Sequence, residues 1–162
     1  MIGITSCDFL GGSIDEADLV GTWNIDDVSA EISVAGINIT QFLIATYEYS
    51  SDSAEAMMDS LVSEFSEGIS GTITFSADYN YVISGSEIEG SGTWSLDTET
   101  DLLSLQETGD TELEILTVET LNATTLIVTL PAEDEELDLN GDGEDETTVD
   151  ISIVIEMSKE EI

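Results

Sequence analysis

From Ile69 onward, apolar and polar residues alternate along the chain, which is the period of an extended strand with one buried face. Short stretches rich in Gly, Asp, Ser and Thr separate seven such runs. An eighth strand, earlier in the chain, is indicated by Gly21-Thr-Trp23 and by apolar residues on both sides of it. The side chains expected on the apolar faces of the seven later runs are Ile73 and Phe75; Tyr79, Tyr81 and Ile83; Trp94 and Leu96; Leu103 and Leu105; Leu113, Ile115 and Thr117; Leu126, Val128 and Leu130; and Val149, Ile151, Ile153, Ile155 and Met157.

Between the first strand and this meander, the period changes to that of an amphipathic helix. Asp52 is a suitable N-cap and Gly68 a suitable end for this helix. The preceding segment, residues 31–50, is compatible with one bent strand, two short strands or a partly helical structure. The helix stripe consists of Ala54, Met57, Met58, Leu61, Val62 and Phe65.

Eight antiparallel strands with a single apolar face lose their exposed edges by closing into a barrel. The sequence therefore predicts an all-β domain over residues 19–159, an eight-stranded up-and-down barrel with one amphipathic helix between the first strand and the meander. We expect this helix to lie across the barrel as a plug or lid, and Trp23 to close one end. Residues 1–18 are expected to be a lipoprotein-signal remnant with Cys7, followed by a flexible tether in the Gly-rich, acidic residues 8–18.

The charge of the chain excludes several classes of function. There are 37 acidic residues, one basic residue (Lys159) and no histidine, so the formal net charge is -36. Such a surface repels phosphate backbones, which excludes nucleic acid as a partner. The absence of histidine removes His-based metal sites and the usual catalytic triads. Since salt relieves repulsion between carboxylates, a saline or cation-rich environment is one explanation of the acidity; an acidic secreted protein is the other.

Cys7 is the single cysteine, so no disulfide framework exists. The residues Ile4-Thr-Ser-Cys7 resemble the end of a bacterial lipoprotein signal, in which the cysteine is acylated after cleavage. A lipid on Cys7 would place the domain at a membrane of the cell envelope, facing the periplasm or the exterior. The alternative is a free thiol near the N-terminus.

An acidic segment separates the last two runs, with nine carboxylates between Glu133 and Glu146. Oxygen-bearing side chains occupy positions 1, 3, 5 and 9 of a calcium-loop pattern, Gly143 is at position 6, and the backbone carbonyl of Glu144 would serve at position 7. Position 12 is Val149, so this is not an EF-hand. We expect Ca²⁺ to bind here as a structural clamp, against the alternative of a solvated acidic hairpin. The ligand candidates are Asp138, Asn140, Asp142, Glu144 and Glu146.

The order of several short blocks resembles the lipocalin-like domains of secreted bacterial lipoproteins of the Bacteroidota type. The resemblance covers residues 19–159 and implies a ligand-binding barrel in which the first-strand tryptophan packs beneath an arginine from a late strand. This chain has no arginine, so we expect that stacking partner to be missing. The helix also falls earlier in the chain than in typical lipocalins. The blocks are Leu19-Val-Gly-Thr-Trp23, Gly71-Thr-Ile-Thr-Phe75, Ala77-Asp-Tyr79, Gly92-Thr-Trp-Ser-Leu96 and Leu121-Asn-Ala-Thr-Thr-Leu126.

Three pairs of large side chains are candidates for a barrel-end or ligand-pocket role. Packing in the core is the favoured interpretation of each pair. The pairs are Trp23 and Trp94, Met57 and Met58, and Tyr79 and Tyr81.

Three functions fit these observations. The first is a membrane-anchored lipoprotein whose barrel binds a small hydrophobic or amphipathic molecule without catalysis. The second is a surface or interaction module with a filled barrel and no ligand. The third is an enzyme with a carboxylate pair, which we do not favour because no spacing singles out one pair among so many acids.

Overall fold

One antiparallel sheet contains all of the strands in the computed structural model, which describes residues 14–66, 69–85, 89–140, 142–143 and 147–160, with the side chains of 64–66 and 131–133 left out. Its order is β2-β1-β3-β4-β5-β6-β7-β8-β9, and β1 also pairs with β9. This extra pairing closes an eight-stranded barrel, so the predicted all-β barrel is confirmed. The strands are β1 (Gly21–Val34), β2 (Ile37–Asn38), β3 (Thr72–Phe75), β4 (Asn80–Ser84), β5 (Glu89–Asp97), β6 (Leu102–Glu107), β7 (Glu114–Leu121), β8 (Thr125–Leu137) and β9 (Thr147–Lys159).

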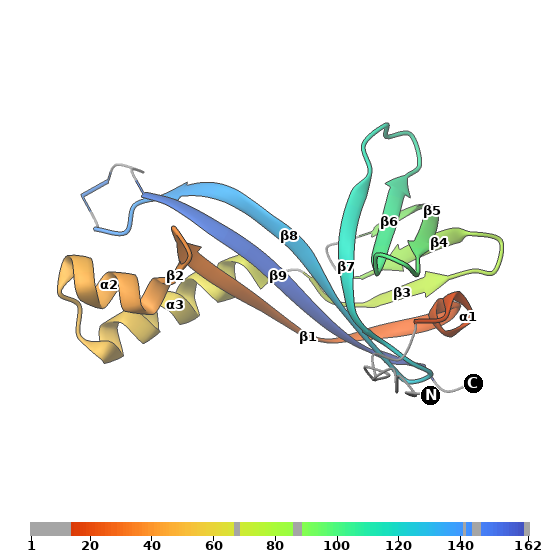
Figure 1. The fold of residues 1–162 in the computed structure, drawn as a ribbon, viewed down its shortest axis with the longest axis horizontal. Helices are drawn as coiled ribbons and strands as arrows, with labels where there is room; N and C mark the ends of the chain where they lie inside the picture. Colours follow the sequence, from red (N-terminus) through yellow and green to blue (C-terminus); the bar gives the residue numbers. More distant parts are fainter. Residues whose placement is uncertain (1–13, 67–68, 86–88, 141, 144–146, 161–162) are drawn as a thin grey trace, which may run out of the picture.

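Three strands are much longer than the others and continue past the barrel (Figure 1). The barrel takes in β3 to β7 and the adjoining halves of β1, β8 and β9. The far halves, residues 27–34, 133–137 and 147–153, form a twisted ribbon with β2 that we call the arm. The molecule is therefore elongated, with the barrel at one end and the arm at the other.

A bulge marks the passage of β1 from barrel to arm. The pairing of β1 with β9 shifts register between Ile25 and Asp27, so one extra residue lies in β1. Before the extra residue, odd-numbered side chains of β1 such as Trp23 face the core. After it, even-numbered side chains such as Ala30 and Ile32 face the core. This explains why the apolar residues of the first strand scatter over both faces in the sequence.

The barrel encloses the larger of two hydrophobic clusters. Its members come from every barrel strand and from the short helix α1 (Glu16–Leu19). The alternation of apolar residues predicts most of this interior, but not that of β7. There, Leu116 and Val118 are 5% and 4% exposed, whereas Leu113 and Ile115 are 58% and 44% exposed, so the predicted inward face of this strand is wrong by one residue.

The second cluster lies between the arm and two helices, α2 (Ile39–Tyr47) and α3 (Ser51–Ser66). The predicted helix stripe supplies Ala54, Met57 and Met58 to this cluster, together with Leu61 and Val62. The helix therefore covers the arm, and the expectation that it plugs the barrel is wrong. The segment left open by the sequence, residues 31–50, contains the end of β1, then β2 and α2.

The N-cap of α3 also differs from the expected one. The hydroxyl of Ser50 accepts a hydrogen bond from the backbone N–H of Ser53 at 3.2 Å, and α3 begins at Ser51. Ser50 therefore caps the helix in place of Asp52.

Candidate functional site

In an up-and-down barrel, successive turns alternate between the two ends. The β3–β4, β5–β6 and β7–β8 turns share one end with the start of β1 and the end of β9. The helix α1 lies at this end, which we call the closed end (Figure 1). The β4–β5 and β6–β7 hairpins lie at the opposite end, which we call the mouth.

Trp23 lies at the closed end and has no exposed surface. Its indole N–H donates to the carbonyl oxygen of Leu19 at 2.8 Å. The Nζ atom of Lys159, on the last strand, lies 5.1 Å from the centre of the Trp23 ring and donates to the carbonyl oxygen of Asp18 at 2.7 Å. The chain has no arginine to stack on Trp23, and its single basic residue, Lys159, supplies a cation in place of that partner.

Trp94 is also part of the packed core. It is 3% exposed, its indole N–H donates to the carbonyl oxygen of Ser76 at 3.2 Å, and Phe75 contacts it edge-on, with 5.9 Å between ring centroids. Tyr79 covers it from outside, with 5.1 Å between ring centroids. Both tryptophans thus have satisfied N–H groups inside the barrel.

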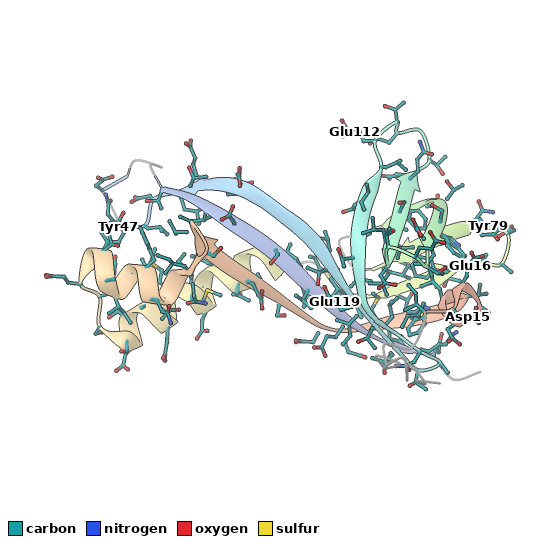
Figure 2. All side chains as sticks on the ribbon, viewed as in Figure 1. Asp15, Glu16, Tyr47, Tyr79, Glu112 and Glu119 are labelled. Carbon is teal, nitrogen blue, oxygen red and sulfur yellow. The ribbon has the colours of Figure 1, made fainter. Side chains whose placement is uncertain are left out.

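Tyr79 and Tyr81 do not share a face. Tyr79 lies in the β3–β4 turn, with φ of 64°, and is half exposed. A hydrogen bond to the carboxylate of Glu16, whose charge acts in the same direction, raises the pKa of Tyr79; Figure 2 shows the two residues together at the closed end. Tyr81 points into the barrel and is 5% exposed.

A hollow of about 520 Å³ opens at the mouth, between the β4–β5 and β6–β7 hairpins. Glu112, at the tip of the second hairpin, and Glu16, the first residue of α1, mark the two ends of the barrel in Figure 2. The hollow is lined by Tyr81, Ile83, Glu89, Gly90, Leu105, Glu107, Asp110, Glu112, Leu113 and Glu114.

Two carboxylates of the hollow occupy inward positions of the barrel. Glu107 follows buried Leu103 and Leu105 by the two-residue period of β6, and Glu114 precedes buried Leu116 and Val118 by the same period. Both positions would carry core residues if the barrel were filled to its rim. The mouth therefore carries negative charge on its inner wall.

Space for the hollow comes partly from Gly90, an inward position of β5. A Cβ atom built on Gly90 would meet nothing closer than Oε1 of Glu107, at 3.7 Å. Gly92, two residues on, is different, because a Cβ there would lie 1.9 Å from the backbone oxygen of Gln106. Gly92 permits close strand packing, whereas Gly90 leaves room in the hollow.

The hydroxyl of Tyr81 faces this space. No hydrogen bond joins it to any residue that the structure describes. No described side-chain oxygen is both sealed from solvent and without a partner, so this hydroxyl must open onto the hollow that Tyr81 lines. Burial raises the pKa of Tyr81, and the charges of Glu107 and Glu114 raise it further, so the phenol keeps its proton at neutral pH.

In the described part of the acidic loop, side chains accept hydrogen bonds from the backbone of the same loop. The two carboxylate oxygens of Asp138 accept backbone N–H bonds from Asp142 at 3.2 Å and Gly143 at 2.7 Å. The side-chain oxygen of Asn140 accepts another from Asp142 at 2.8 Å. Of the five predicted calcium ligands, Asp138, Asn140 and Asp142 are thus brought together.

The same loop is attached to the second hydrophobic cluster. Leu139 is 1% exposed within it. The Tyr49 hydroxyl donates to the carbonyl oxygen of Leu139 at 3.3 Å, and the Tyr47 hydroxyl lies 3.3 Å from the hydroxyl of Thr147. The loop is therefore connected to the end of α2 and to the segment between α2 and α3.

Several predicted site residues lie away from the hollow or outside the described residues. Met57 and Met58 belong to the arm cluster. Cys7, Glu144 and Glu146 lie outside the described residues. In the part of the chain that the structure does describe, no three carboxylates or thiols gather closely enough to hold a metal ion. None of the described helices has the length and apolar character needed to span a bilayer.

The sequence reasoning missed Glu107, Glu114, Gly90 and Lys159 as site residues. For Glu107, the signal is the two-residue period of β6, which marks Leu103 and Leu105 as inward and also reaches position 107. For Glu114, the predicted inward face of β7 is wrong by one residue, so the sequence places this glutamate on the outer face. Gly90 could be predicted as inward because it shares the two-residue period of Trp94. Lys159 could be predicted near Trp23 because it lies on the last strand, which closes the barrel against the first.

No family model matches the chain, and no curated protein matches it. Among solved structures, the chain is similar to the crystal structure of a DUF4847 family protein from Bacteroides vulgatus. The two are 14% identical, with 90% of this chain and 98% of that chain covered and a TM-score of 0.42.

Proposed function

We propose that the protein is a lipocalin-like binding module that takes up a small amphipathic molecule at the mouth of its barrel, without catalysis. The hollow of about 520 Å³ carries this proposal. Its volume lies within the range of roughly 300–1,000 Å³ that is typical of small-molecule sites, and it combines apolar side chains with a few polar groups.

The alternative, an interaction module with a filled barrel, is supported by the closed end alone. There, Trp23, Phe75 and Trp94 leave almost no exposed surface. At the mouth, three inward positions, Gly90, Glu107 and Glu114, lack apolar side chains, which favours the binding module.

Filling the hollow tests the proposal. Gly90→Val adds a side chain inside the hollow, and Ser91→Val adds a similar one on the outer face of the same strand. The neutral dye N-phenyl-1-naphthylamine avoids repulsion by the acidic surface. We expect it to bind the wild type and Ser91→Val equally and to bind Gly90→Val at least tenfold more weakly. Equal binding to all three proteins, or to none, would contradict the proposed function.

We also propose that a lipid on Cys7 anchors the protein in the cell envelope. The described chain begins at Ile14, directly before α1 at the closed end. Mass spectrometry of the protein expressed in bacteria with an export signal should find an acyl modification that is absent from Cys7→Ala; an unmodified wild type would contradict the anchor.

A third proposal is that the acidic loop binds Ca²⁺ as a structural clamp for the arm. Support comes from the convergence of Asp138, Asn140 and Asp142 and from the burial of Leu139. Calcium at a hundredfold excess over Kd should add about 2.7 kcal/mol to the free energy of unfolding, compared with chelator. Asp138→Asn should abolish the gain and Asp52→Asn, on exposed helix surface, should keep it; no calcium effect on the wild type would refute the clamp.

A further inference from the structure

We infer that the ligand of the mouth is an organic cation with an apolar body, such as an alkylammonium ion. This inference rests on the proposed function and names the chemical class of its ligand. The observations that carry it are the charge of the hollow, the hydroxyl of Tyr81 and the apolar floor beneath them.

The charge of the hollow has one sign. Five carboxylates line it, from Glu89, Glu107, Asp110, Glu112 and Glu114, and no basic residue does. The only basic residue of the chain, Lys159, lies at the closed end with Trp23 and Asp18. A ligand with a carboxylate or phosphate would meet repulsion here and no compensating cation.

Two of these carboxylates, those of Glu107 and Glu114, differ from the other surface carboxylates because they point into the barrel. Glu107 and Glu114 occupy inward positions whose strand neighbours, Leu105 and Leu116, are core residues. Both carboxylates are exposed to the solvent of the hollow, so a ligand that enters it meets two negative charges directed at the same space. A bound cation would reduce the repulsion between them.

The hydroxyl of Tyr81 supplies an independent observation. The side chain is 95% buried, since 5% of it is exposed, and its hydroxyl has no hydrogen-bond partner among the described residues. An ammonium group lying between Glu107 and Glu114 could donate to the phenol oxygen and to both carboxylates. This group would satisfy the hydroxyl that the protein leaves without a partner.

The floor of the hollow indicates why the cation is organic. Leu105, 6% exposed, and Ile83 provide apolar surface below the carboxylates, and Leu113, 58% exposed, provides more at the rim. A bare metal ion would leave this surface in water. An alkyl chain attached to the ammonium group would cover it, with a gain that grows with the apolar area buried.

Three ligands of equal chain length separate charge from hydrophobicity: decylammonium, decanol and decanoate. Calorimetric titration should give decylammonium at least tenfold tighter binding than decanol and no measurable binding of decanoate. Because a protein of this charge attracts any cation loosely, variants with the same change in net charge are needed as controls.

The test pair is Glu107→Gln with Glu114→Gln at the mouth, and the control pair is Glu55→Gln with Glu99→Gln on exposed surface elsewhere. We expect the mouth variant to bind decylammonium about tenfold more weakly and the control to stay within about twofold. Decanol binding should be unchanged in both, and circular dichroism should show both folded.

The outcomes distinguish the two proposals. If decanol and decylammonium bind equally and both are lost in Gly90→Val, the binding site stands and the cationic ligand is refuted. Equal losses of decylammonium in the two charge variants, or tightest binding of decanoate, would also refute it. If none of the three ligands binds, the proposed function itself fails.

Discussion

The barrel and the arm are built from the same three long strands but stabilise their cores in different ways. In the barrel, closure by β1 and β9 lets strands alone enclose the apolar residues. The arm stays open at residues 27–34 of β1 and 133–137 of β8, so its apolar face needs α2 and α3 as a cover. One sheet thus supports two hydrophobic clusters, one enclosed by strands and the other covered by helices.

The largest expected effect comes from removing one leucine from each cluster. Leu126 and Leu43 have no exposed surface, and Leu→Ala at either position should cost about 2–5 kcal/mol. The costs should appear in different places. Leu126→Ala should lower the midpoint of global urea unfolding, whereas Leu43→Ala should speed hydrogen exchange in α2, α3 and the arm while the barrel stays protected.

Equal acceleration of exchange across barrel and arm in Leu43→Ala would mean that the two clusters unfold as one unit. Val82→Ala, at a barrel position that is 51% exposed, serves as a control and should change neither measurement by more than about 0.5 kcal/mol.

An intermediate effect is expected at the closed end of the barrel. Lys159→Met keeps the length of the side chain but removes the cation over Trp23 and the bond to Asp18. We expect a loss of about 1–2 kcal/mol in the free energy of unfolding, measured by urea denaturation and accompanied by a change in tryptophan fluorescence. Lys159→Arg should restore most of it. A stability equal to wild type in Lys159→Met would show that the cation does not hold this end.

The smallest effect is expected at the polar face of the arm, where Asp134 and Asp150 are paired across β8 and β9. A hydrogen bond with Asp134 raises the pKa of Asp150, and burial and the Asp134 charge act in the same direction. A raised pKa means that the folded arm binds the proton more tightly than the unfolded chain. This contribution to stability is therefore present below the unfolded pKa and is lost as the pH rises through the folded pKa.

Asp150→Asn should accordingly raise the melting temperature slightly at pH 7 and have no such benefit near pH 3. Melting curves at the two pH values check this, with Asp97→Asn as a carboxylate outside the arm. An equal rise in melting temperature at both pH values would contradict the proposed protonated pair of Asp134 and Asp150.

The sequence predicts the barrel well because burial on one face imposes a period of two on every strand. It does not show where the barrel ends and the arm begins. The alternation in β9, from Val149 to Met157, runs through both regions unchanged, and the boundary is revealed by register shifts in the two strands that pair with it, β1 and β8. The position of α3 over the arm depends on that boundary, and so does the wrong expectation of a plug.

The site could be predicted less completely for a related reason. In β7, Leu113 and Ile115 compete with Leu116 and Val118 for the inward face, and both choices give an apolar alternation. The choice that buries Leu116 also turns Glu114 into the barrel, which a count of apolar residues alone cannot decide. The inward face depends on the register of β7 with its neighbouring strands, and the local sequence alone does not determine that register.

The most direct test of the account is a decylammonium titration followed by the amide chemical shifts of the protein. We predict shifts concentrated in the β4–β5 and β6–β7 hairpins, with Gly90, Glu107 and Glu114 among the largest, while Trp23 and the helices α2 and α3 stay unchanged. Shifts centred on the arm, or spread evenly over the acidic surface, would contradict a binding site at the mouth of the barrel.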